Sequence, residues 1–202
     1  MRIAIIGGTF DPIHNGHLAI AHSVATTFQA DEVHFVPAFS PPHKQSLGIT
    51  SPFHRFAMVS LATMPFEQFR PSTIEVDALE KRYSVQTLEL MREIYPGAEM
   101  LFVVGADMYQ DIETWKDFRR LFELAHFVVI NRPGFRIRED LMPVQTVYSD
   151  TPIRLPNKNS VFFLPFVEQP ISSTEIRAAI GKAKQWLPQQ VWSYIEKNNL
   201  YS

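Results

Sequence analysis

The sequence has 202 residues, of which 46% are hydrophobic and 20% charged, as in an ordinary globular protein of one domain. Its 19 lysine and arginine residues against 21 acidic residues give a net charge of −2 and form no long basic run, which disfavours a polymeric nucleic-acid partner. Cysteine is absent, which excludes disulfide bonds, thiolate metal sites and a cysteine nucleophile.

The first predicted element is a buried strand over residues 2–6 that ends at a turn made by Gly7 and Gly8. A helix is predicted from near Asn15, because apolar residues then recur at helical spacing. These residues are Leu18, Ala21, Val24, Ala25 and Phe28. A strand, a glycine turn and a helix start form the place where parallel α/β proteins bind phosphate, because backbone N–H groups are unpaired there and the helix dipole favours an anion.

His14 and His17 are three residues apart and are expected to share a helix face at the mouth of this site. Taken alone, two histidines at this spacing are more often surface or capping residues. A histidine metal site is the other alternative, but it lacks an evident third ligand beyond Asp11, and we name no protein metal ligand. Neither a P-loop nor a G-x-G-x-x-G dinucleotide fingerprint occurs in the sequence.

The rest of the chain alternates strands and helices. Further strands are predicted over residues 32–37, 72–76, 100–104, 125–130 and 161–164. Further helices are predicted over residues 51–64, from 80–88 to about 95, as a short element after Asp107, from 171 and over 189–198, while 135–160 has only a weak pattern. The alternation indicates an α/β fold, a Rossmann-like doubly wound parallel sheet with helices on both faces. We expect a single domain over residues 1–202, with a C-terminal helical part from about 171.

Two further places combine a structural signal with a functional one. Gly105 ends a strand as Gly8 does, and Asp107 after it is expected to cap the next helix or to lie at a ligand site. Ser172 and Glu175 fit a capping box at the helix start near 171. Three hydroxyl residues there, with Arg177 one turn later, also suit a phosphate group.

Residues 7–17, G-G-T-F-D-P-I-H-N-G-H, resemble the signature of the nucleotidyltransferase superfamily that shares the H-x-G-H motif. The whole chain is similar to bacterial nicotinate-nucleotide adenylyltransferases. The matching segments are P-P-H-K at 41–44, R-Y-S-V-Q-T-L at 82–88, G-A-D at 105–107, W-K at 115–116, N-R-P-G at 131–134 and I-S-S-T-E-I-R at 171–177. One position departs from that pattern, since Ser84 stands where the family usually has threonine.

The resemblance implies transfer of an adenylyl group from ATP to nicotinate mononucleotide, with His14, His17 and Arg177 as catalytic residues. A nearby triphosphate should raise the pKa of the two histidines above about 6.5 and favour the charged donors. The implied ATP-binding residues are Gly7, Gly8, Thr9, Phe10, His14, His17, Gly105, Asp107, Arg132, Ser172, Ser173, Thr174 and Arg177. The implied nicotinate mononucleotide-binding residues are Thr9, Phe10, His43, Lys44, Ser84, Trp115 and Lys116. Mg²⁺ is expected to be bound through the ATP phosphates.

Three alternatives remain open at this point. A sibling enzyme would use phosphopantetheine or would transfer a cytidylyl group, and a relative would prefer nicotinamide mononucleotide. A non-catalytic nucleotide-binding module would need the glycines but would have no use for His14, His17 and Arg177 together. All apolar runs are well short of 18 residues and no signal-peptide pattern is visible, so we expect no membrane span and a cytoplasmic location.

Overall fold

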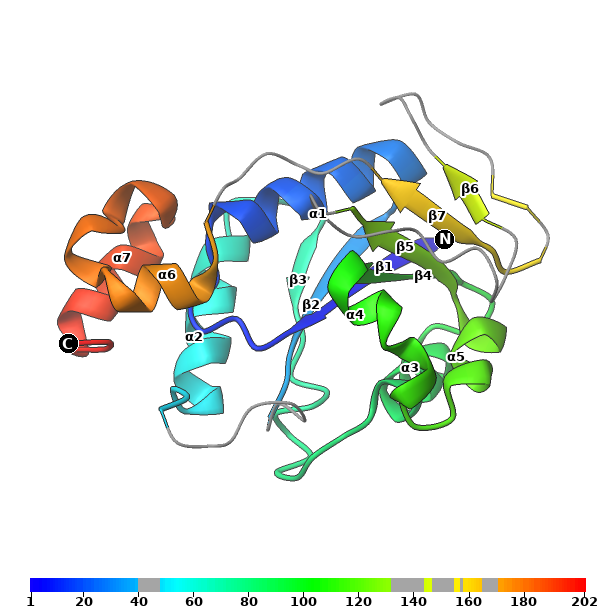
Figure 1. Cartoon of the computed structure of the whole chain (residues 1–202), viewed down its shortest axis with the longest axis horizontal. Helices are drawn as coiled ribbons and strands as arrows, with labels where there is room; N and C mark the ends of the chain where they lie inside the picture. Colours follow the sequence, from blue (N-terminus) through cyan, green and yellow to red (C-terminus); the bar gives the residue numbers. More distant parts are fainter. Residues whose placement is uncertain (40–47, 132–143, 147–154, 157, 165–170) are drawn as a thin grey trace. The chain divides into compact units, whose positions relative to one another are not determined.

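The structure is a computed structural model that describes residues 1–39, 48–131, 144–146, 155–156, 158–164 and 171–202. Its strands are β1 (Arg2–Gly8), β2 (Glu32–Pro37), β3 (Phe69–Pro71), β4 (Glu99–Gly105), β5 (His126–Ile130), β6 (Val144–Thr146) and β7 (Val161–Leu164) (Figure 1). Its α-helices are α1 (Asn15–Phe28), α2 (Pro52–Thr63), α3 (Ser84–Ile94), α4 (Ala106–Gln110), α5 (Phe118–Leu124), α6 (Ser173–Ala178) and α7 (Gln189–Lys197). Short 3-10 helices are η1 (Ile112–Thr114), η2 (Ile180–Lys182) and η3 (Lys184–Trp186). None of the helices in these ranges is long and apolar enough to cross a membrane.

The strands form a sheet in the order β3-β2-β1-β4-β5-β7-β6. The pairs β1 with β4, β4 with β5, β5 with β7 and β6 with β7 are parallel. Neighbours that are not consecutive in the chain require crossover connections, and helices separate the strands from β1 to β5 in sequence, as in doubly wound proteins. The predicted Rossmann-like α/β fold is therefore confirmed.

Packing divides the chain into two compact units. The first consists of Met1–Ile6, His22–Val33 and Tyr83–Val167, and the second of Gly7–Ala21, His34–Arg82 and Glu168–Ser202. The division runs through β1, α1 and β2, so each unit takes pieces from several parts of the chain. The expectation of a single domain with a C-terminal helical part from about 171 stays a prediction.

The first unit is built on strands with near-continuous apolar sequences, as is usual for parallel strands buried on both faces. All residues of β5 and β7 are buried, and the rings of Phe127 and Phe162 are completely so. Helices α3 and α5 lie side by side in this unit (Figure 1). The backbone N–H of Tyr83 donates to the Gln86 side chain at 3.0 Å, which helps to begin α3 where it was predicted.

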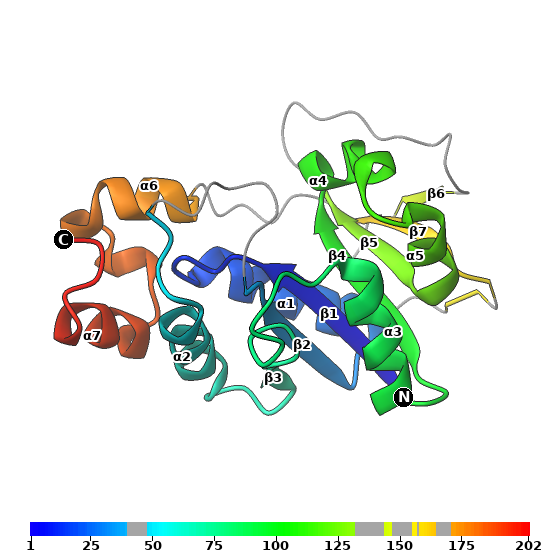
Figure 2. The same cartoon turned by 90° about the horizontal axis from the view of Figure 1, so that it is seen from below.

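The second unit contains α2, β3, α6 and α7, and Figure 2 shows α7 beside α2. Pro52 occupies the first turn of α2, as expected of a proline at a helix start. Helix α7 buries Val191, Trp192 and Ile195, one face of an amphipathic helix. The predicted helices at 51–64 and 189–198 are confirmed within one or two residues at their ends.

One predicted strand is wrong and another strand was missed. The strand near residue 72 is β3, which ends at Pro71, and residues 74–78 form a turn instead. The Ser72 hydroxyl accepts the N–H of Ile74 at 3.4 Å, and the N–H of Asp77 donates to the Thr73 carbonyl at 2.7 Å. These local bonds occupy the backbone and compete with a strand. Strand β6 was not predicted, because it is three residues long within the weakly patterned segment 135–160.

Candidate functional site

Strand β1 extends through both glycines, so the predicted turn at Gly7 and Gly8 lies further on, in the loop before α1. A Cβ atom on Gly8 would lie only 3.1 Å from the ring of Phe10, whereas one on Gly7 would meet nothing within 4 Å. Phe10 is 2% exposed and adopts a left-handed backbone conformation with φ of 50°. Glycine at position 8 therefore gives the Phe10 ring the room that it needs against the backbone.

The two histidines of the H-x-G-H motif lie against each other at the start of α1. Their ring centroids are 3.8 Å apart, and the Phe10 ring meets the His17 ring edge-on at 5.0 Å. The backbone N–H of His14 donates to Nδ1 of His17 at 3.2 Å, and the N–H of Gly16 donates to Nδ1 of His14 at 3.2 Å. The loop backbone thus orients both imidazole rings.

These bonds define how the histidines carry their protons. An Nδ1 atom that accepts a hydrogen bond has no proton, so the proton of each neutral ring is on Nε2. Protonation of either ring would place a proton on Nδ1 and break its bond to the backbone. The geometry therefore leaves Nε2 as the donor atom of each ring, and the charged donors expected from the sequence stay a prediction.

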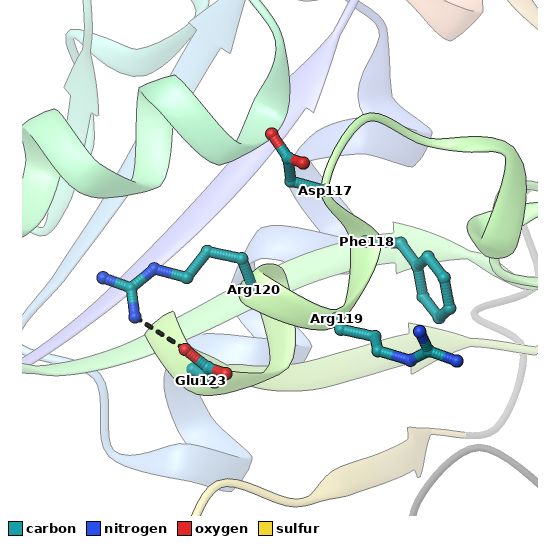
Figure 3. A pocket seen from close by; sticks show the side chains of 5 residues that line it. All are labelled: Asp117, Phe118, Arg119, Arg120 and Glu123. Atoms are coloured by element: carbon teal, nitrogen blue, oxygen red, sulfur yellow. Dashed lines mark hydrogen bonds and ion pairs between the residues drawn. The ribbon is translucent and has the colours of Figure 1, made fainter.

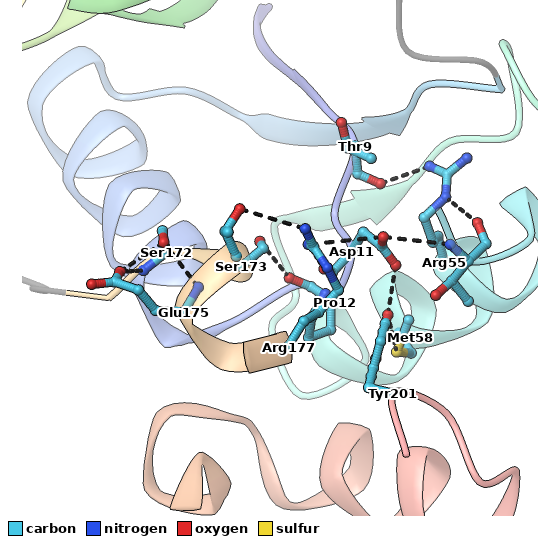
Figure 4. Close-up of polar contacts among 12 residues, drawn as sticks. Thr9, Asp11, Pro12, Arg55, Met58, Ser172, Ser173, Glu175, Arg177 and Tyr201 are labelled. Atoms are coloured by element: carbon cyan, nitrogen blue, oxygen red, sulfur yellow. Dashed lines mark hydrogen bonds and ion pairs between the residues drawn. The ribbon is translucent and has the colours of Figure 1, made fainter. Parts of the chain in front are cut away.

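The start of α6 is attached to the histidine loop within the same unit (Figure 4). The Ser173 hydroxyl donates to the Pro12 carbonyl at 3.0 Å, and Arg177 Nη1 donates to the Asp11 carbonyl at 2.6 Å. Arg177 Nη2 lies 3.5 Å from the Thr174 hydroxyl oxygen. The structure therefore brings the predicted phosphate residues at 7–17 and at 172–177 together.

The predicted capping box at α6 is confirmed. The Ser172 hydroxyl oxygen accepts the N–H of Glu175 at 3.2 Å, while the Glu175 carboxylate accepts the Ser172 N–H at 2.8 Å and its O–H at 2.7 Å. Hydrogen bonds from Ser172 lower the pKa of Glu175, so this carboxylate is charged. In this conformation the Ser172 hydroxyl proton is directed at Glu175.

Asp11 is a residue whose role the sequence did not reveal. Its side chain is 1% exposed, yet Oδ1 accepts the Tyr201 hydroxyl at 2.7 Å and Oδ2 accepts the Thr50 N–H at 3.4 Å (Figure 4). Arg177 Nη1 lies 3.8 Å from Asp11 Oδ2, beyond hydrogen-bond distance. A carboxylate in the middle of a predicted phosphate site is thus held by neutral donors, with Arg177 at a longer distance.

Arg55 is the second residue that the sequence analysis missed. It is completely buried, and its guanidinium group donates to four carbonyl groups. These are the carbonyls of Thr9 at 2.6 Å, Ala38 at 2.6 Å, Thr50 at 2.9 Å and Phe39 at 3.1 Å. Burial lowers the pKa of Arg55, and the nearby charge of Asp11 opposes that shift. One guanidinium therefore joins the ends of three loop segments.

The remaining described residues of the predicted site lie in the first unit. Ser84 is the first residue of α3, and Lys116 Nζ lies 4.8 Å from the ring centre of the adjacent Tyr83, a cation–π contact. Trp115 is half-buried, with its ring edge-on to Phe102 at a centroid distance of 6.3 Å. The structure therefore brings the Lys116 side chain to the start of α3, as the predicted nicotinate site requires.

Asp107 does not cap the next helix, which was one of the two roles expected for it. The N-cap of α4 is Gly105, and Asp107 lies inside the first turn of this helix. An acidic side chain in the first turn is favourable because the helix dipole is positive there. Gly105 ends β4 as expected, so both residues remain at the carboxyl end of a parallel strand.

Three predicted site residues, His43, Lys44 and Arg132, lie outside the described residues. In the described ranges, no group of three or more His, Asp or Glu side chains could hold a metal ion. The carboxylate of Asp11, the third ligand that a histidine metal site would need, is directed at Tyr201 and Thr50 instead.

A pocket on α5 contains none of the predicted site residues (Figure 3). It is lined by Asp117, Phe118, Arg119, Arg120 and Glu123. Arg120 donates to Glu123 at 2.6 Å and to Glu89 at 3.5 Å, and the guanidinium of Arg119 lies 5.1 Å from the ring centre of Phe118. Its arginines thus interact with neighbouring side chains of the same surface.

The Rossmann-like fold and the H-x-G-H loop joined to α6 define a nucleotidyltransferase class of protein. Residues 5–179 match the family described as cytidylyltransferase-like, and the chain belongs to this family. The chain is 38% identical over 203 residues to a "probable nicotinate-nucleotide adenylyltransferase" of Desulfitobacterium hafniense (strain Y51), covering 99% of this chain and 95% of the relative. It is 40% identical over 204 residues to a protein of the same name from Clavibacter michiganensis, covering 100% of this chain and 94% of the relative.

A solved structure has the same fold. It is that of Plasmodium falciparum nicotinic acid mononucleotide adenylyltransferase complexed with NaAD, with a TM-score of 0.76 and 22% sequence identity. The match covers 99% of this chain and 97% of that one. The curated relatives extend the resemblance seen in the sequence over the whole chain, and the solved structure shows that the fold is the same.

Proposed function

We propose that this protein transfers the adenylyl group of ATP to nicotinate mononucleotide, giving nicotinate adenine dinucleotide and pyrophosphate. The observation that carries the proposal is identity of 38–40% over the full length to relatives named for this activity. The local geometry supports it, because the H-x-G-H loop and the start of α6 are held together by Arg177 and Ser173. The proposal places the reaction in the cytoplasm and in NAD biosynthesis.

The chemistry needs no protein nucleophile. A phosphate oxygen of nicotinate mononucleotide attacks the α-phosphorus of ATP, and the bond from that phosphorus to the β-phosphate oxygen breaks, so pyrophosphate leaves with the electron pair. The attacking phosphate has a second pKa of about 6 and is largely dianionic at neutral pH. Catalysis then consists of positioning and of charge stabilisation by donors that are already in place.

His14 and His17 are proposed to donate their Nε2–H groups to the ATP phosphates. Arg177 and the hydroxyls of Ser173 and Thr174 would hold the β- and γ-phosphates that leave as pyrophosphate. The Ser172 hydroxyl reaches a phosphate only after it turns away from Glu175. Thr9 and Phe10, with Gly7 and Gly8, would form the floor on which the two nucleotides meet.

The pyridine ring of nicotinate mononucleotide is proposed to lie at residues of the first unit. Trp115 would stack on the pyridine ring, and the positive charge of Lys116 with the start of α3 at Ser84 would receive the carboxylate. His43 and Lys44 are proposed for the mononucleotide phosphate, and Gly105, Asp107 and Arg132 for adenosine.

Mg²⁺ is proposed to be held by the phosphate oxygens of ATP and by water, where it would neutralise charge on the phosphates. The donor set fits this arrangement, because Asp11 directs its oxygens at Tyr201 and Thr50. The protein's part is to bind and orient the phosphates with His14, His17 and Arg177.

The test is pyrophosphate release from Mg-ATP with three acceptors in parallel: nicotinate mononucleotide, nicotinamide mononucleotide and phosphopantetheine. Release is expected with the first, and no release with any of them would refute the enzyme. Pyrophosphate release with only nicotinamide mononucleotide, or with only phosphopantetheine, would show that this compound is the acceptor in place of nicotinate mononucleotide.

His17→Ala should lower turnover by about 10²–10³, the usual effect of losing one preorganised donor. His22→Ala is the matched control, because His22 lies on the same helix with an exposed side chain. Circular dichroism checks that both variants are folded. Equal turnover of the two variants would contradict the role of His17.

A further inference from the structure

The contact between Tyr201 and Asp11 joins the segment after α7 to the predicted phosphate site. The Tyr201 hydroxyl donates to Asp11 Oδ1 at 2.7 Å, a short bond to a carboxylate that is 1% exposed (Figure 4). In the part of the chain that the structure describes, the other carboxylate oxygen accepts a longer bond, from the Thr50 N–H at 3.4 Å. A buried carboxylate needs hydrogen-bond donors. The Tyr201 hydroxyl gives Asp11 the shorter of these two bonds.

Arg177 is a charged donor close to this carboxylate. Its Nη1 already donates to the backbone carbonyl of Asp11 at 2.6 Å, and the same nitrogen is 3.8 Å from Asp11 Oδ2. A shift of about 1 Å would turn this separation into a charge-assisted hydrogen bond. The Arg177 side chain is 25% exposed, so such a shift would withdraw a guanidinium group from the surface where a ligand could reach it.

Other features of the segment hold Tyr201 in place. Its backbone is left-handed, with φ of 66°, and it follows a helix end at which the N–H of Leu200 donates to the Ile195 carbonyl at 3.1 Å. Burial raises the pKa of Tyr201 far above its ordinary value, so the hydroxyl keeps its proton and acts as the donor. The Met58 sulfur lies 4.0 Å from the same hydroxyl oxygen.

We propose that Tyr201 is a positioning residue for ATP: by binding Asp11 it keeps the carboxylate from capturing Arg177, which stays available to the phosphates. This inference rests on the proposed function and adds to it a residue outside the recognised motifs. Loss of the Tyr201 hydroxyl pulls Arg177 toward Asp11 and weakens the binding of ATP. The binding of the mononucleotide is unaffected, because Arg177 is not proposed to touch it.

The test compares Tyr201→Phe with Tyr194→Phe. Tyr194 is the matched control, because its hydroxyl makes a bond of similar length, 2.8 Å to His54 Nδ1, in the same unit. Tyr201→Phe should raise the KM for ATP by about tenfold, the lower end of what a hydrogen bond to a charged group contributes. It should leave the KM for nicotinate mononucleotide within about twofold, while Tyr194→Phe changes neither. An unchanged KM for ATP, or equal increases for both substrates, would overturn the proposal.

A double-mutant cycle separates positioning from a general effect on folding. Asparagine at position 11 lacks the charge that attracts Arg177, so Tyr201→Phe should have no further effect on the KM for ATP in an Asp11→Asn background. A rise in the KM for ATP when Tyr201→Phe is added to Asp11→Asn would refute the proposal, and this comparison does not need the Tyr201→Phe single variant to fold. A wild-type protein that releases no pyrophosphate would instead refute the proposed function.

Discussion

Replacing Arg55 by methionine should destabilise the protein strongly, because its guanidinium group donates to four carbonyl groups. Arg55→Met keeps most of the apolar stem and removes the guanidinium, whose donors lie 2.6–3.1 Å from these carbonyls. The side chain is completely buried, so water does not easily take its place. The buried charge of Asp11 also loses a nearby positive charge.

The size of the effect follows from these contacts. A buried polar group left without a partner costs about 1–3 kcal/mol, but four carbonyls on one side chain are not independent and can partly relax. Removing one partner of a buried charge network typically costs about 3–5 kcal/mol, which we take for Arg55→Met. For a protein of this size, each kcal/mol lowers Tm by about 2–4 °C, so Tm should fall by roughly 10 °C.

The assay is thermal and denaturant unfolding followed by circular dichroism. Arg92→Met is the control, because Arg92 is exposed and is recorded to donate to one carbonyl, that of Leu124 at 2.9 Å. It should cost less than about 1 kcal/mol. Arg55→Lys should give an intermediate loss, since one ammonium group cannot reach all four carbonyls. If Arg55→Met costs no more than Arg92→Met, the carbonyl contacts are not what stabilises the loops.

Three further outcomes are expected. Gly8→Ala should cost about 1–3 kcal/mol, because its Cβ would lie 3.1 Å from the buried Phe10 ring, whereas Gly7→Ala should be near neutral in the same unfolding assay. Equal Tm values for the two variants would contradict the close approach. Trp115→Ala should raise the KM for nicotinate mononucleotide in the pyrophosphate assay and leave the KM for ATP unchanged, and an unchanged mononucleotide KM would remove the stacking role. His126 is buried and its pKa is lowered by that burial, so the unfolded chain binds the proton more readily. Its contribution to stability is therefore complete above the unfolded pKa of about 6.5 and decreases as the pH falls below it. His126→Asn should reduce the fall in Tm between pH 7.5 and 5.5, and an unaltered slope would show that another group controls it.

The parts of the site that could be predicted from the sequence are those with local signals. The capping box of Ser172 and Glu175 needs only four consecutive residues, and the structure contains both of its hydrogen bonds. The apolar spacing of α1 is likewise local, and all five residues that define it are buried. Each of these signals depends on contacts within one turn or one helix face.

Arg55 shows what local signals leave out. It is followed at helical spacing by the buried Met58, Val59 and Ala62, so its place on the apolar face of α2 could have indicated burial. Nothing near it in the sequence identifies the carbonyls of Thr9 or Ala38 as its partners, because these contacts depend on how distant segments pack. Tyr201 and Asp11 are 190 residues apart, and no periodicity connects them.

The short distance between the His14 and His17 rings makes the charge of Arg177 important for the proposed reaction. Two charged imidazole rings with centroids 3.8 Å apart would repel each other by about 4 kcal/mol at an effective dielectric constant of 20. Each charge would also break the bond that Nδ1 accepts from the backbone. In the proposed reaction, His14 and His17 would orient the phosphates, and positive charge for the leaving pyrophosphate would come from Arg177 and from any cation that arrives with ATP. If the buried Asp11 captured Arg177, the guanidinium group would be directed at the carboxylate and away from the phosphates. By binding Asp11, the Tyr201 hydroxyl would prevent this.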